Sequence, residues 1–81
     1  MAKQSQLTFF ESKIIAFTRY YFNTGILHVK FNNGKIYEYF DVTLACYIQL
    51  IAAESIGSAF HKVIKANYEG DLIADIKPID G

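Results

Sequence analysis

The side chains best suited to binding chemistry in this chain are two tyrosines one strand step apart, Tyr37 and Tyr39. Rings at this spacing on an exposed strand can stack on successive nucleic-acid bases. Glu38 lies between them, and the turn residues Asn33 and Gly34 precede them. Whether the two rings face solvent or the hydrophobic core therefore decides how strongly the pair indicates nucleic-acid binding.

Residues for catalysis or metal binding are few. His28 and His61 are the only histidines, and neither has a second ligand at the spacing of a metal site. Cys46 lies in an apolar segment, where a free cysteine usually behaves as a small hydrophobe with an ordinary thiol. Glu38 beside His28 has the residue types of a catalytic acid–base pair, but such residues on neighbouring strands more commonly form a structural ion pair at the surface. We therefore expect no enzyme activity, no cofactor and no bound metal.

Residues 55–58 (Ser-Ile-Gly-Ser) are a candidate phosphate site. Backbone amides at a helix start point outward and favour an anion. A basic cluster follows, which consists of His61, Lys62 and Lys65. The interpretation that we favour is simpler: a serine caps a helix, Gly57 permits the turn, and the basic cluster is a solvated face.

The composition limits the class of protein. With 81 residues the chain is one domain, near the size at which a single core just suffices, and a content of 52% hydrophobic residues argues against disorder. Eight Lys and Arg balance eight Asp and Glu, so nucleic-acid binding needs a local patch. The single cysteine, Cys46, excludes an internal disulfide, and no apolar run has the length of a signal-peptide core or a membrane span. We expect a soluble, cytoplasmic protein.

The pattern of the chain predicts an α+β fold with the order β-β-β-α-α. Residues 12–22, 26–31 and 35–40 are expected to form a three-stranded antiparallel meander. A helix begins at Asp41 or Thr43 and covers one side of the sheet with the apolar stripe Leu44, Tyr47, Ile48, Ile51 and Ser55. A second, shorter helix contains Phe60, Val63 and Ile64 and ends near Tyr68. Residues 12–68 form the expected domain, and residues 69–81 form an extension whose apolar part predicts a short edge strand or a docked segment.

Two registers of the second hairpin give opposite answers for the tyrosines. A two-residue Asn33-Gly34 turn places Tyr37 and Tyr39 beside Lys30 and His28 in solvent, and buries Glu38 without a cation. A three-residue loop with Gly34 in a left-handed bulge pairs Val29 with Tyr37 and places both tyrosines in the core. We favour the second register, because burying an unpaired carboxylate costs several kcal/mol.

In this register the other side of the sheet is exposed, and we call it the open face. A four-residue loop over residues 22–25 then turns Tyr20 toward Leu27 in the core. The residues expected on the open face beside Glu38 are Phe17, Arg19, Tyr21, His28, Lys30, Ile36 and Phe40.

An ordered set of residues from Ser12 to Tyr68 resembles the KTSC domain, a small module found at the C-terminus of some lysyl-tRNA synthetases and as free-standing bacterial and phage proteins. Thr43 departs from the family pattern, which usually has Pro there, and His61 replaces a small amide; neither disturbs the core pattern. The matching residues are Ser12, Ile15, Tyr20, Leu27, Val29, Phe31, Gly34, Tyr37, Tyr39, Val42, Ser55, Gly57, Phe60, Ile64 and Tyr68.

The resemblance implies a stand-alone bacterial or phage member of a family of undetermined function for which RNA binding has been suggested. It also implies that the motif residues have mainly structural roles. These are Tyr20, Gly34, Tyr37, Tyr39, Ser55, Gly57 and Phe60.

Two functions fit the open face. The first is a nucleic-acid-binding accessory module, in which Phe17, Tyr21 and Phe40 stack on bases. The cations expected to contact phosphate are Arg19, Lys30, Lys62 and Lys65. The second is a module in which the same face binds a protein partner or a second copy of the chain, since exposed apolar patches often mark interfaces. The balanced net charge favours the second function, and the interleaved rings and cations favour the first.

Overall fold

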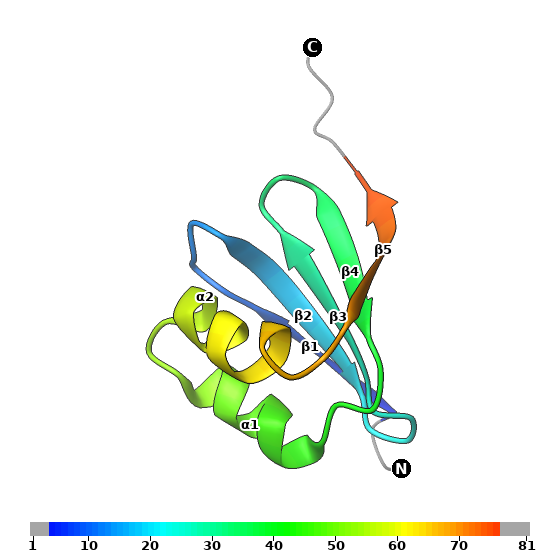
Figure 1. The fold of residues 1–81 in the computed structure, drawn as a ribbon. Coiled ribbons are helices and arrows are strands. Elements are labelled where there is room, and N and C mark those ends of the chain that lie inside the picture. Colours follow the sequence, from blue (N-terminus) through cyan, green and yellow to red (C-terminus); the bar gives the residue numbers. More distant parts are fainter. Residues whose placement is uncertain (1–3, 77–81) are drawn as a thin grey trace.

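The computed structural model describes residues 4–76 and shows an antiparallel sheet of five strands with the helices on one of its faces (Figure 1). The strands lie side by side in chain order, from β1 at one edge to β5 at the other. Their bounds are β1 (Ser5–Phe9), β2 (Ile15–Tyr21), β3 (Ile26–Phe31), β4 (Lys35–Tyr39) and β5 (Gly70–Asp75). The expected α+β class is confirmed, but the expected three-stranded meander understated the sheet.

The two additional strands lie before and after the predicted meander. β1 pairs with β2 and places Leu7 opposite Arg19 and Phe9 opposite Phe17. β5 pairs with β4 and is the edge strand expected in the extension, while residues 77–81 of that extension lie outside the described residues. Both strands therefore pair directly with the three strands of the predicted meander.

The turn between β3 and β4 has the register that keeps Glu38 out of the core. Gly34 has a φ of 94°, and its amide donates to the carbonyl of Phe31 at 3.0 Å. Val29 is paired with Tyr37. Glycine adopts this left-handed backbone without steric strain, which explains why it closes the three-residue loop.

A bulge in β2 changes which of its side chains point to the core side of the sheet. Ile15 pairs with Phe31 and Phe17 pairs with Lys30, so Ala16 is the extra residue. The bulge allows Ile15 to be fully buried while Phe17 lies on the opposite side of the sheet. Farther along, Tyr20 is paired with Leu27 as expected.

Helix α1 (Leu44–Ala52) is capped by Thr43, whose hydroxyl accepts a hydrogen bond from the amide of Cys46 at 3.2 Å. The expected apolar stripe is wrong in part, because Leu44 and Ile48 are about half exposed (50% and 51%). The helix instead buries Tyr47 and Leu50, and it ends before Ser55. Tyr47 fixes this rotation by stacking on Tyr20, with their ring centroids 4.3 Å apart.

The second helical segment consists of α2 (Ile56–Ala59) and the π-helical turn η1 (Phe60–Lys65). Ser55 caps α2, since its hydroxyl accepts from the amide of Ser58 at 3.4 Å. Gly57 lies within α2 rather than at a turn, and it packs closely on Ile14, since a Cβ there would lie 3.1 Å from the Ile14 side chain. The segment is thus the predicted second helix, but it is divided and stops at Lys65.

The core lies between the sheet and these helices. Tyr20 is buried, and its hydroxyl donates to the carbonyl of Val42 at 2.7 Å. Thr18 is fully buried, and its hydroxyl has no hydrogen-bond partner among residues 4–76. The large side chains that fill the core are Ile15, Leu27, Val29, Tyr39, Tyr47, Leu50, Phe60 and Ile64.

Candidate functional site

The open face is the side of the sheet opposite the helices. Strand pairing brings Phe17, Lys30 and Ile36 into one row and Arg19, His28 and Glu38 into the next. Tyr21 is half-buried on the same side of β2, and Phe40, which follows β4, is 46% exposed. Strand β1, which the sequence prediction lacked, adds Leu7 and Phe9 to these rows.

An aromatic cluster with a cation lies at the β1 side of this face. The rings of Phe9 and Phe17 meet edge to face with centroids 5.6 Å apart. The ammonium nitrogen of Lys30 lies 5.6 Å from the centroid of the Phe17 ring, within cation–π range. Phe9 is 71% exposed, the highest value among the large apolar side chains of residues 4–76. This cluster therefore offers rings and a positive charge to a ligand.

An ion pair occupies the middle of the open face. His28 Nε2 and Glu38 Oε2 are 2.7 Å apart, and their side chains are 21% and 24% exposed. Tyr21 contacts the His28 ring edge to face at a centroid distance of 5.3 Å. Arg19 lies in the same row and donates from Nη1 to the Ser5 hydroxyl at 3.2 Å. The pair is the surface ion pair expected from the sequence, and it leaves Arg19 and Lys30 as the cations available to an anionic ligand.

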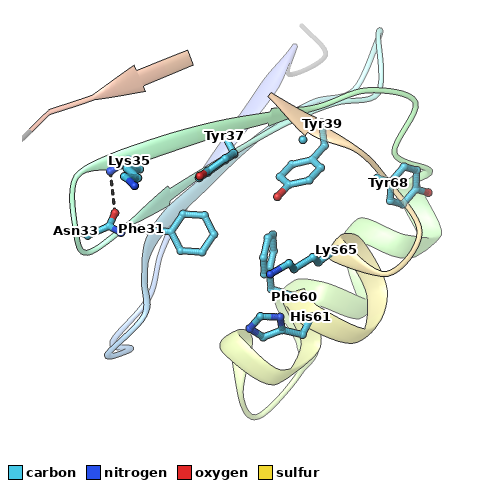
Figure 2. Close-up of a pocket in the computed structure, with 10 residues that line it drawn as sticks. Phe31, Asn33, Lys35, Tyr37, Tyr39, Phe60, His61, Lys65 and Tyr68 are labelled. Carbon is cyan, nitrogen blue, oxygen red and sulfur yellow. Dashed lines mark hydrogen bonds between the residues drawn. The ribbon is translucent and has the colours of Figure 1, made fainter. Parts of the chain in front are cut away.

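A cavity of about 380 Å³ lies on the other side of the sheet, between β4 and η1, and we call it the helix-side cavity. Figure 2 shows its lining side chains approaching from the strands and from the helical segment. The lining residues are Phe31, Asn33, Lys35, Tyr37, Tyr39, Phe60, His61, Lys65, Tyr68 and Gly70.

The cavity combines an aromatic wall with cations. The Phe31 ring contacts Tyr37 and Phe60 edge to face at 5.6 and 5.2 Å. Tyr39 contacts Phe60 at 5.7 Å, and burial raises the pKa of Tyr39 to about 12. The positive or protonatable groups in the lining are Lys35, His61 and Lys65.

The sequence prediction did not find this cavity, although it named several of its residues. Three of the residues expected to be structural pack on the core and also line the cavity: Tyr37, Tyr39 and Phe60. The basic cluster is divided, because His61 and Lys65 line the cavity while Lys62 lies beside Ser55 and Ser58. Lys62 and Lys65 are on the helical side, so the prediction that they assist the open face is wrong. No local motif in the sequence indicates a cavity whose walls come from residues 31–70.

The described part of the chain lacks a cluster of metal ligands, and its Cys46 thiol is perturbed. Within residues 4–76 no group of three or more His, Cys, Asp or Glu side chains is positioned to hold a metal ion. The Cys46 thiol is not ordinary, because hydrogen bonding from Thr43 and then Tyr68 lowers its pKa; the Tyr68 hydroxyl lies 3.5 Å from the sulfur. Among the described residues, no helix has the length and apolar character required to cross a bilayer.

Comparisons with known proteins identify a family. The family model for the KTSC domain matches residues 3–68. Two curated relatives, both named lysine–tRNA ligase, are 39% identical (Trichormus variabilis) and 41% identical (Nostoc sp.) over 64 residues. That segment is 79% of this chain but only 11% of each relative. The crystal structure of a KTSC domain protein from Yersinia pestis is similar with a TM-score of 0.79 and 25% identity, over 85% of this chain and 97% of that one.

Proposed function

This chain belongs to the KTSC domain family, and we propose that it is a small non-enzymatic module that binds single-stranded RNA through the open face of its sheet. The observation that carries the proposal is the cluster of Phe9, Phe17 and Lys30. An exposed ring beside a second ring and an ammonium group suits a nucleotide, which has a flat base and an adjacent phosphate.

The geometry of the cluster supports stacking rather than burial in the domain. Phe9 lies on the edge strand β1 and is 71% exposed, so a base can reach it without a conformational change. Base stacking on an aromatic side chain contributes about 1–3 kcal/mol. Phe9 is therefore assigned to a base, with Phe17 and Lys30 beside it.

The phosphate contacts are assigned to Arg19 and Lys30. Both lie on the open face in adjacent rows, whereas His28 is hydrogen-bonded to Glu38. Two phosphate contacts on a single strand give a slope of about −1.4 for log K against log salt concentration. The balanced net charge of the chain is consistent with such modest electrostatics.

The relatives support RNA as the class of ligand. Two proteins named lysine–tRNA ligase are similar to this chain over 64 residues, and their name specifies an RNA. The chain spans about a tenth of those proteins, so the support extends to the class of ligand and to no particular reaction.

The second candidate is binding of a protein partner or a second copy through the same face. Leu7 and Phe9 are 39% and 71% exposed on this side, and exposed apolar groups are typical of interfaces. The cation over Phe17 favours the RNA proposal, because apolar interface centres are depleted of lysine.

The test is a fluorescence anisotropy titration with labelled single-stranded RNA of about 12 nucleotides over a salt series. We expect binding at low salt, weakened about tenfold by Phe9→Ala, the loss of one stacked base. Ile48→Ala is the matched control, since Ile48 is also exposed and apolar but lies on α1, across the sheet. Equal affinities of Phe9→Ala and Ile48→Ala, or no binding at low salt, would overturn the proposal.

Sedimentation of the free protein separates the two candidates. A monomer at high concentration that binds RNA supports the RNA module. A dimer that is dissociated by Phe9→Ala and binds no RNA supports the interface between copies instead.

A further inference from the structure

We propose that the helix-side cavity is a second binding site, which takes a nucleoside monophosphate unit: an aromatic base joined to a phosphate. This site lies across the sheet from the open face and goes beyond the RNA-binding function proposed above. A free nucleotide and the phosphorylated end of an RNA strand share this chemistry.

The wall of the cavity suits the base. The Phe31 ring contacts Tyr37 and Phe60 edge to face, with centroid distances of 5.6 Å and 5.2 Å. Figure 2 shows Tyr37 and Tyr39 extending from β4 toward the side where Phe60, His61 and Lys65 extend from η1. Phe60 already contacts Phe31 and Tyr39, so a flat ring is placed beside this contact, where Tyr37 from β4 and His61 from η1 also line the cavity.

The size of the cavity suits one such unit. Its volume of about 380 Å³ is near the lower end of the range of about 300–1,000 Å³ for small-molecule sites. Gly70 is part of the lining, and its lack of a side chain lets β5 approach the Tyr39 ring, since a Cβ at that position would lie 2.5 Å from the ring.

The charge of the cavity suits the phosphate. Lys35, His61 and Lys65 are in the lining, and none of the described lining residues carries a carboxylate. Asp75 is opposite Lys35 in the strand register, but it is exposed and outside the lining, so solvent screens its competition. A phosphate bound among these groups accepts charge-assisted hydrogen bonds.

The polar groups argue against an ordinary packing defect. An empty defect in a core is typically walled by apolar groups, whereas this wall contains the side chains of Asn33, Tyr37, Tyr68 and two lysines. Convergent polar groups above an aromatic surface are typical of ligand sites.

The experiment is a calorimetric titration of the full chain with AMP in phosphate-free buffer, beside adenosine and inorganic phosphate. We expect AMP to bind at least about tenfold more tightly than either part, because it uses both the rings and the cations. Adenosine binding as tightly as AMP would overturn the assignment of the cations. Absence of AMP binding, with no effect of a terminal phosphate on RNA binding, would overturn the site.

Two lysines of η1 provide a matched pair of variants. Lys62 and Lys65 are both exposed and three residues apart, but only Lys65 lines the cavity. Lys65→Gln should weaken AMP binding about tenfold, and Lys62→Gln should leave it unchanged. Both variants should unfold at the wild-type temperature. Equal effects of the two substitutions would show that AMP responds only to overall charge.

Two further comparisons identify the source of the ligand and separate this site from the open face. If RNA with a terminal phosphate binds more tightly than AMP, and more tightly than the same RNA without the phosphate, the ligand is a strand end. If phosphorylated RNA and AMP bind with equal affinity, the ligand is a free nucleotide. Phe9→Ala should leave AMP binding unchanged, and Lys65→Gln should leave binding of unphosphorylated RNA unchanged. AMP affinity lost in Phe9→Ala and kept in Lys65→Gln would assign the nucleotide to the open face and overturn the site.

Discussion

The buried side chain of Tyr39 makes the stability of the domain depend on alkaline pH. Tyr39 is 5% exposed, and its burial raises the pKa from 10.0 to about 12. The unfolded Tyr39 loses its proton near pH 10, whereas the folded Tyr39 keeps it until about pH 12. The stability that this difference contributes is therefore fully present below pH 10 and is lost as the pH rises through about 12. The folded state should therefore weaken above pH 10.

The size of the loss follows from the shift. Between pH 8 and pH 11 the unfolded Tyr39 releases most of its proton while the folded residue keeps it. The difference corresponds to about 1.4 kcal/mol of unfolding free energy, equivalent to one pKa unit. The full shift of about two units limits the total loss to roughly 3 kcal/mol at higher pH.

Urea unfolding of the wild type and Tyr39→Phe at pH 8 and pH 11 measures this contribution. Phe retains the ring contact with Phe60 but has no proton to lose. We expect the wild type to lose about 1.4 kcal/mol more than the variant between the two pH values. The pH 8 measurement on each protein is the control for the substitution itself. The same pH dependence in both proteins would refute the account.

Two further predictions concern the packing of the core and of β5. Thr18→Val should raise the unfolding free energy by about 1 kcal/mol in urea unfolding, because it removes a fully buried hydroxyl that lacks a partner among the described residues; lower stability would show that the hydroxyl is satisfied. Gly70→Ala should lower the unfolding free energy by about 1–3 kcal/mol and reduce the melting temperature, because the added Cβ meets the buried Tyr39 ring at 2.5 Å; an unchanged melting temperature would show that β5 shifts freely.

The register of the central strands could be predicted because one charged residue decides it. Burying Glu38 is costly, so the alternation around it selects one of two hairpins, and His28 pairs with Glu38 as that choice requires. The open face could be predicted from the same alternation. Its edge residues Leu7 and Phe9 could not, because β1 was not recognised.

β1 was missed because the connection after it lacks the usual turn residues. Residues 10–14 contain no Gly, Pro or Asn. The chain turns there with Ser12, whose hydroxyl accepts from the amides of Ile14 and Ile15 at 3.1 and 3.3 Å. A serine in this role is a weaker local signal than glycine or proline.

The rotation of α1 and the helix-side cavity depend on tertiary packing. Apolar residues surround most of α1, so periodicity alone does not select the buried side, and the stack of Tyr47 on Tyr20 does. The cavity joins residues from β3, β4, η1 and β5. Neither arrangement has a signature within a short segment of sequence.

The connection into β5 has a consequence for local stability. The other strands follow their neighbours directly, whereas β5 joins β4 only after the helical segment, and Ala74 is its one residue that is not exposed. Backbone amides of β5 should therefore exchange with deuterated solvent through an opening of lower free energy than those of β3. Gly70 of β5 lines the helix-side cavity. A ligand that binds the cavity only when β5 is paired would stabilise the paired state by mass action and slow this exchange. The exchange rate of the β5 amides would then measure how much of the cavity is occupied.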